Sequence, residues 1–168
     1  TPLSYRIESF FHIIENRFDR AMAEAQRAID LDPNDPNGFE AMAWVLVHIG
    51  RPGESLDFIR RAERLDPRSD YSYRIGEAQV HQGRNEGAAA TMRQYSESHP
   101  DNLYPFLYIA ASYGHLGRVE EARLAVESYK RLRAELTLEM GGAVEQVGIY
   151  VFRRGGLEEG RLQDGLRK

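Results

Sequence analysis

The sequence predicts an all-α fold, an α-solenoid of about four helix-turn-helix repeats followed by a C-terminal helical cap. Three observations support this prediction. Proline recurs in the turns LDPND, LDPRS and SHPDN, at Pro33, Pro67 and Pro100. Glycine recurs midway between these prolines, at Gly50, Gly83 and Gly117. The stretches between the turns have helical patterns of apolar residues, and a period of about 34 residues with two turns indicates stacked helical hairpins.

The apolar patterns locate the helices within each unit. In residues 21–31, three alanines and Ile29 fall on one helix face at i, i+4, i+7 and i+8. Residues 39–50 and 107–117 are patterned in a similar way, and each stretch ends on a glycine. Glycine fits these ends because the residue after a helix often adopts a left-handed conformation, which costs glycine nothing.

Residues after the turns predict where the next helices begin. Pro52 fits the first helical position, Asn85 fits a capping side chain, and Glu120–Glu121 match the positive end of the helix dipole. Asp35-Pro36 and Asp101-Asn102 predict the starts of other first helices. The resulting units are about 2–35, 36–68, 69–102 and 103–134, so that the repeats occupy 1–134 and capping helices occupy 135–168.

Three histidines recur with the turns, in HIGRPGE, HQGRNEG and HLGRVEE. His48, His81 and His115 each precede the turn glycine by two residues, where a cation suits the negative end of a helix dipole. Neighbouring helices pack about 8–10 Å apart, so equivalent residues form a row. Zinc needs its ligand atoms about 2.0–2.1 Å from one point. The histidines are therefore interpreted as structural; the alternative, a histidine metalloenzyme, predicts stoichiometric zinc.

Composition excludes several classes of function. The chain has 168 residues, of which 42% are apolar and 29% charged, as in soluble globular proteins. A net charge of −4 gives no reason to expect binding of a nucleic acid, which needs a clustered positive surface, and the absence of cysteine excludes disulfides and thiolate chemistry. The start TPLSYRIESFFH is no signal peptide, and no stretch approaches the ~20 apolar residues of a membrane helix. We expect a cytoplasmic protein without nucleic-acid or membrane partners.

Motifs of catalysis are absent from the sequence. It contains no phosphate-binding loop, dinucleotide fingerprint, HExxH or GxSxG motif, and GGAVEQVG lacks the lysine and hydroxyl that a phosphate loop needs. The pairs Glu120–Glu121 and Glu158–Glu159 point about 100° apart on a helix and cannot share one substrate. We therefore predict a chain that is not an enzyme and has no catalytic, cofactor-binding or metal-binding residues.

Small residues occupy equivalent places in consecutive units. They are Ala21, Ser55, Ala88 and Ala122 early in the second helix, Ala28 and Ala62 later in it, and Ser9, Ala43, Gly76 and Ala110 in the first helix. With the period, this pattern resembles the tetratricopeptide repeat over about residues 2–134. The resemblance implies a right-handed superhelix. Tyr95 and Tyr129 depart from the family's small position, which affects the expected packing angle of the last units.

The resemblance also implies a concave groove lined by the first helix of each unit. The family's groove positions match Arg6, Phe10, Asn37, Glu40, Trp44, Tyr73, Arg74, Glu77, Tyr104, Leu107, Tyr108 and Ala111. This set contains no lysine, so the carboxylate clamp of chaperone-binding members is not expected. An apolar ligand fits better: a helix, an extended segment or another copy of the chain. The alternative is that Trp44 and the tyrosines pack only against neighbouring helices.

From about Ala134 the repeat pattern ends, and helices are expected within 135–150 and at about 157–167, although VGIYVF also fits a strand. RAIDLDPNDPNGFEAMAWVLVHIGRPGESL, GHLGRVEEARLAVE and the closing LQDGLRK resemble the C-terminal tetratricopeptide region of bacterial class III adenylate/guanylate cyclases. That resemblance implies an alternative function, a regulatory or dimerising segment of a nucleotidyl cyclase. The cyclase catalytic part is not in this sequence, and a catalytic domain encoded upstream of Thr1 would decide the question.

Overall fold

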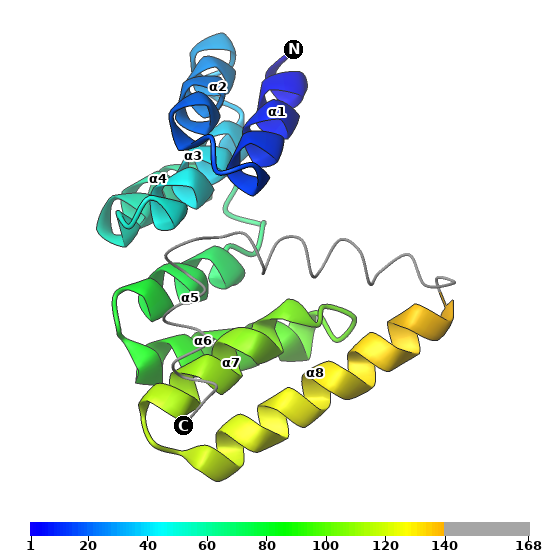
Figure 1. The fold of residues 1–168 in the computed structure, drawn as a ribbon. Helices are drawn as coiled ribbons and strands as arrows, with labels where there is room; N and C mark the ends of the chain where they lie inside the picture. Colours follow the sequence, from blue (N-terminus) through cyan, green and yellow to red (C-terminus); the bar gives the residue numbers. More distant parts are fainter. Residues whose placement is uncertain (140–168) are drawn as a thin grey trace.

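The computed structural model describes residues 1–139, which form eight α-helices and no strand (Figure 1). The helices are α1 (Pro2–Ile14), α2 (Phe18–Leu31), α3 (Pro36–His48), α4 (Pro52–Leu65), α5 (Ser72–His81), α6 (Asn85–Ser98), α7 (Tyr104–His115) and α8 (Val119–Glu139). Consecutive helices pair as antiparallel hairpins, and the hairpins stack in chain order. The all-α solenoid predicted from the sequence is confirmed.

The last described helix is longer than the others. α8 runs without interruption to Glu139, past residue 134, where the repeat pattern of the sequence ends. The predictions for the rest of the C-terminal region lie outside the described residues: the helix within 135–150 beyond Glu139, the helix at about 157–167, the GGAVEQVG segment and the closing LQDGLRK.

The glycine turns have the predicted backbone conformation. Gly50, Gly83 and Gly117 have φ values of 76°, 73° and 72°, in the left-handed region. The backbone N–H of each glycine donates to a carbonyl three residues earlier, which closes the preceding helix. The first unit has no glycine at this place, and Asn16 adopts the left-handed conformation instead, with φ 57°. Asparagine is among the few other residue types that tolerate it.

The helix starts agree with the sequence in part. Asp35 caps α3 by accepting a hydrogen bond from the Asn37 N–H, and Pro52 is the first residue of α4. The prediction that the Asn85 side chain caps α6 is wrong: Arg84 is the N-cap residue, and no side chain bonds there. The turn at Gly83 is short, and Arg84 N–H already donates to the Gln79 carbonyl, so the helix begins one residue earlier than a capping Asn85 requires.

Replacing Gly50 with alanine is expected to lower the free energy of unfolding by about 1–2 kcal/mol, because an L side chain is strained at positive φ even though the space around a Cβ is open. The matched control is Gly53→Ala in α4, where a Cβ would meet only Gln82 Nε2 at 3.9 Å. That change should be neutral or stabilising because alanine favours a helix. Urea unfolding followed by circular dichroism measures both, and equal effects would contradict the prediction.

Small residues allow the helices to approach closely. Ala21, Ala28, Ala43 and Ala62 have no exposed surface, and the Ser9 hydroxyl donates to the Ala21 carbonyl at 2.8 Å. A Cβ added at Gly76 would lie 2.9 Å from two atoms of Met92, closer than real contacts allow. The small residues that the sequence pattern singled out therefore lie where α1 contacts α2 and where α5 contacts α6.

The buried apolar residues form two clusters. One is built by α1–α4 and also includes Tyr71, with Ile75 packed against it. The other is built by α5–α8 and includes Met92, Tyr108 and Ile109. At the seam between the two hairpin pairs, polar side chains of α3, α5 and α7 connect the halves.

Candidate functional site

A pocket of about 340 Å³ opens between α1, α3 and α5. It is lined by Arg6, Ile7, Phe10, Phe11, Asn37, Glu40, Ala41, Trp44 and Arg74. Six of these are groove residues predicted from the sequence: Arg6, Phe10, Asn37, Glu40, Trp44 and Arg74. The structure therefore brings together the predicted residues of the first two units and one from the third.

Aromatic side chains form one wall of the pocket. The ring of Phe10 stacks on Trp44 with centroids 5.0 Å apart and planes 23° apart. The guanidinium carbon of Arg74 lies 5.0 Å from the centre of the Trp44 ring, within the range of a cation–π contact. His48 meets the same indole edge-on at 5.1 Å. Trp44 thus contacts groups from α1, α3 and α5, and it retains only 9% of its surface exposed.

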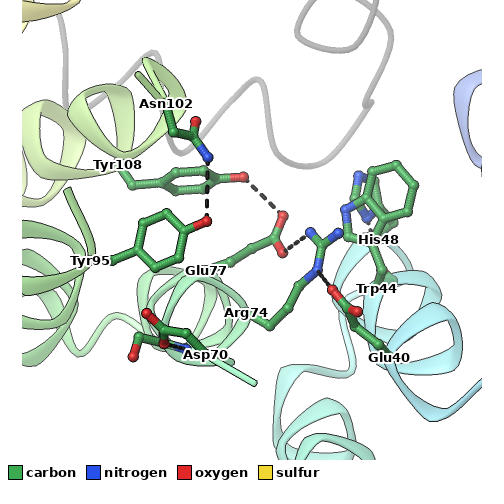
Figure 2. A network of polar contacts seen from close by, with 10 residues as sticks. Glu40, Trp44, His48, Asp70, Arg74, Glu77, Tyr95, Asn102 and Tyr108 are labelled. Carbon is green, nitrogen blue, oxygen red and sulfur yellow. Dashed lines mark hydrogen bonds and ion pairs between the residues drawn. The ribbon is translucent and has the colours of Figure 1, made fainter. Parts of the chain in front are cut away.

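Arg74 holds a charged network beside this wall (Figure 2). Its Nε donates to Glu40 Oε1 at 3.1 Å, and its Nη1 donates to Glu77 Oε2 at 2.9 Å. The other oxygen of Glu77 accepts a hydrogen bond from the Tyr108 hydroxyl at 2.9 Å. The network therefore joins α3, α5 and α7 across the seam between the two halves.

The charged forms of Glu77 and Arg74 are stabilised by the opposite charges beside them. Glu77 is only 2% exposed, so its carboxylate needs the partners that the network supplies. Burial by itself lowers the pKa of Arg74, but the carboxylates of Glu77 and Glu40 outweigh it and raise the pKa above the ordinary arginine value. Arg74 and Glu77 thus connect parts of the protein, whereas ligand binding by the groove to which the family resemblance assigns them stays a prediction.

Apart from Arg74, the predicted groove residues of the third and fourth units do not line the pocket. The Tyr73 ring packs edge-on against Tyr108, with centroids 5.8 Å apart, and lies tilted by 53° against Tyr95, with centroids 5.4 Å apart. Tyr108 is buried, and Ala111 has no exposed surface. Tyr104 and Leu107 are partly buried, and burial raises the pKa of the Tyr104 phenol. These five residues and Glu77 are therefore not among the residues that line the pocket, whereas the other six predicted groove residues are.

Tyr95 occupies a position that holds alanine in the first two units (Ala28 and Ala62), and its side chain packs at the end of α6 and against α5. Its ring stacks on His99 with centroids 4.0 Å apart and planes 10° apart. Its hydroxyl accepts a hydrogen bond from Asn102 Nδ2 at 3.5 Å. The larger side chain is thus accommodated at the end of α6 and beside α5.

Arg6 of α1 is a second cationic side chain that lines the pocket, beside Arg74. Its Nη1 lies 3.8 Å from Asp35 Oδ2, which is an ion-pair distance but too long for a hydrogen bond. The other oxygen of Asp35 accepts hydrogen bonds from the Asn37 backbone N–H and side-chain amide. The guanidinium of Arg6 therefore offers N–H donors to a ligand at this end of the groove.

Sequence reasoning missed three residues that also line the pocket: Ile7, Phe11 and Ala41. Ile7 and Phe11 lie four residues apart on α1, so their spacing is the signal that could have found them. They make the pocket more apolar than the predicted set alone. Its chemistry suits a side chain that is largely apolar, with polar partners at the rim.

The described residues form neither a metal-binding cluster nor a membrane-spanning helix. Among residues 1–139, no group of three or more His, Asp or Glu side chains could hold a metal ion. His48, His81 and His115 lie in the last turns of α3, α5 and α7, and His48 Nδ1 is 2.9 Å from the Trp44 carbonyl oxygen. The helices in this range are too short or too polar to cross a bilayer.

Comparison with known proteins gives one result for the family and one for curated relatives. The family model described as tetratricopeptide repeat matches the chain three times, at residues 15–70, 40–102 and 73–135. These overlapping matches cover α2 to most of α8. No curated protein matches the chain.

Proposed function

Because the chain belongs to the tetratricopeptide repeat family, we propose that it is a non-catalytic protein–protein interaction module whose pocket between α1, α3 and α5 binds a peptide or partner domain. The observation that supports this proposal is the pocket itself. It combines an aromatic wall of Phe10 and Trp44 with Arg6, whose guanidinium makes no hydrogen bond among the described residues. We also propose that the protein acts in the cytoplasm.

The ligand that suits this pocket has an apolar anchor and a polar flank. Aromatic and arginine side chains dominate the energy of protein interfaces when an apolar group of the partner covers them. The anchor would lie against Phe10, Trp44 and Ala41, while an acceptor on the partner would bond to Arg6. Glu40 Oε2, to which Arg74 does not donate, would accept a hydrogen bond from an N–H or O–H group of the partner at the opposite rim.

The variant Ala41→Glu tests the proposal, because it places a charge on the partly buried floor of the pocket. The wild-type chain is used to capture partners from a lysate of the source cells, and these are identified by mass spectrometry. The variant should fail to capture the same partners. Titration of one such partner, followed by fluorescence of Trp44, the only tryptophan, should show affinity reduced at least about tenfold.

The matched control is Ala23→Glu, the same change at an exposed position of α2 that does not line the pocket. It should keep the partners, and circular dichroism should show that both variants fold. Equal binding by the folded Ala41→Glu chain and the wild type would refute binding at this pocket.

The alternative function, a regulatory or dimerising segment of a nucleotidyl cyclase, is supported by the sequence resemblance alone. Its most distinctive part, LQDGLRK, lies outside the described residues. A cyclase domain encoded upstream of Thr1 would support this alternative, and an initiator methionine directly before Thr1 would exclude it.

A further inference from the structure

A second pocket, of about 320 Å³, lies between α6, α7 and α8, and we call it the α6–α8 pocket. Its apolar lining consists of Phe106, Ile109, Leu124 and Ala125. Ile109 and Ala125 are buried, whereas Leu124 beside them is 55% exposed. No residue that lines it also lines the pocket between α1, α3 and α5, so the two pockets are separate surfaces.

The shape of the α6–α8 pocket belongs to the repeat, but its charge does not. An equivalent pocket of about 480 Å³ lies between α2, α3 and α4. Gln26 lines that pocket at the repeat position where Arg93 lines the α6–α8 pocket. The arginine of the equivalent pocket, Arg51, already donates to both carboxylate oxygens of Glu54. A cation without a carboxylate partner thus distinguishes the α6–α8 pocket.

Arg93 faces the α6–α8 pocket and not its own helix. Its Nη1 donates to the Tyr113 hydroxyl of α7 at 3.4 Å, a long hydrogen bond, and within residues 1–139 it makes no ion pair. Arg60, at the same repeat position of α4, donates instead to Asp57 Oδ1 on its own helix at 2.7 Å. In α6 the position of Asp57 is held by Ala90, so Arg93 has no carboxylate one turn before it.

The Tyr113 hydroxyl supplies a second donor beside Arg93. The side chain is 6% exposed, and the guanidinium carbon of Arg118 lies 4.5 Å from the ring centre. The hydroxyl oxygen accepts the hydrogen bond from Arg93, while its O–H donates to no acceptor in the described part of the chain. Arginine N–H groups and a phenolic O–H therefore point to one place, and a carboxylate oxygen accepts strong hydrogen bonds from both.

The acidic residues of the pocket limit the charge of its ligand. Glu121 is paired with Arg118, but Glu97, four residues after Arg93 on α6, is exposed and has no ion pair among the described residues. A ligand with several negative charges would be repelled by Glu97. The pocket therefore suits one carboxylate flanked by apolar groups, and it does not suit a phosphate or a nucleic acid.

We propose that the α6–α8 pocket is a second docking surface, which binds a segment of a partner protein that carries one aspartate or glutamate beside a large apolar side chain. The carboxylate accepts hydrogen bonds from Arg93 and Tyr113, and the apolar side chain covers Leu124 and Ile109. Arginine and tyrosine are among the residue types that contribute most to binding when a partner covers them. This proposal does not depend on the pocket of the proposed function.

The test begins with random linear peptides displayed on phage and selected on the full chain. Clones are then sorted by their binding to two variants, Arg93→Glu in the α6–α8 pocket and Ala41→Glu in the other pocket. Clones lost with Arg93→Glu and kept with Ala41→Glu should share an aspartate or glutamate next to a leucine, isoleucine, methionine or phenylalanine. Clones with the opposite behaviour report on the proposed function, so the two proposals can fail separately.

Titration of one such synthetic peptide, followed by fluorescence anisotropy, measures the contribution of each group. Arg93→Glu should weaken binding at least about tenfold, because it places two carboxylates in contact. The matched control is Arg60→Glu, at the same repeat position of α4, which should leave the affinity unchanged. A peptide with lysine in place of its acidic residue should recover binding to the Arg93→Glu chain, to within about threefold of the original pair.

A variant on another helix keeps the test independent of Arg93. Leu124→Asp changes an exposed side chain of α8 and should also weaken the peptide at least about tenfold, and circular dichroism checks that each variant folds. The proposal would be overturned by a selection without Arg93-dependent clones, by such clones lacking an acidic residue, or by a lysine peptide that fails to recover binding. A dimer of the chain that dissociates with Arg93→Glu would assign the pocket to a second copy and also overturn it.

Discussion

Replacing Arg74 with alanine is expected to lower the free energy of unfolding by about 3–5 kcal/mol. The change removes both ion pairs of the guanidinium and leaves the carboxylate of Glu77, which is 2% exposed, with its hydrogen bond from the Tyr108 hydroxyl. An uncompensated buried carboxylate costs more than the net contribution of the pair itself. Urea unfolding followed by circular dichroism at 222 nm measures the loss.

Two further variants identify the cause. Arg123→Ala removes ion pairs to Glu120 and Glu127 on the exposed surface of α8, and it should have no measurable effect on unfolding. Combining Arg74→Met with Glu77→Leu removes both charges, so the double variant should be more stable than Arg74→Ala alone. A loss below about 1 kcal/mol for Arg74→Ala would show that the network does not stabilise the seam.

The variant Trp44→Ala is expected to lose a similar amount, about 3–5 kcal/mol, because it removes the largest side chain of the first cluster. Phe10 loses its stacking partner, Arg74 its cation–π contact and His48 its edge-on contact. Thermal and urea unfolding by circular dichroism test this prediction. Trp44→Phe is the control, since it retains an aromatic ring beside Phe10, and its loss should be clearly smaller.

The stability of Trp44→Ala decides how a loss of partner binding in that variant is interpreted. If Trp44→Ala unfolds at lower denaturant by the expected amount, loss of partner binding in that variant reports structure as well as contact. A Trp44→Ala chain as stable as the wild type would instead mean that the indole contributes only to the pocket surface. Ala41→Glu avoids this ambiguity, because its side chain faces the pocket and is only partly buried.

Local rules were sufficient to predict the fold. The turn glycines were predicted from their spacing, and their left-handed backbone confirms the reason for them. The same rules failed where two residue types satisfy one requirement. Asn16 provides the left-handed residue of the first unit, where no glycine marks the turn. Asn85 has the chemistry of a cap, but the hydrogen bonds of the Gly83 turn place the N-cap at Arg84.

The candidate site was predictable only as a set of helix positions. The family register placed Arg6, Trp44 and Arg74 on the concave side, and the structure brings these three to one pocket. The family register does not reveal that Arg74 pairs with Glu40, 34 residues away, or that Glu77 pairs with Tyr108, 31 residues away. Such contacts depend on the rotation of neighbouring helices, which no local pattern encodes.

The division of the apolar core has a consequence for how the protein unfolds. α1–α4 and α5–α8 each bury their own cluster, and at the seam between them Arg74 bonds to Glu40 and Glu77. In solenoids, cooperativity is transmitted only through such nearest-neighbour interfaces. We therefore expect the two hairpin pairs to unfold as two units that are coupled through this seam. A ligand that contacts both α3 and Arg74 adds its binding energy to that coupling, so occupancy makes the chain unfold more nearly as one unit.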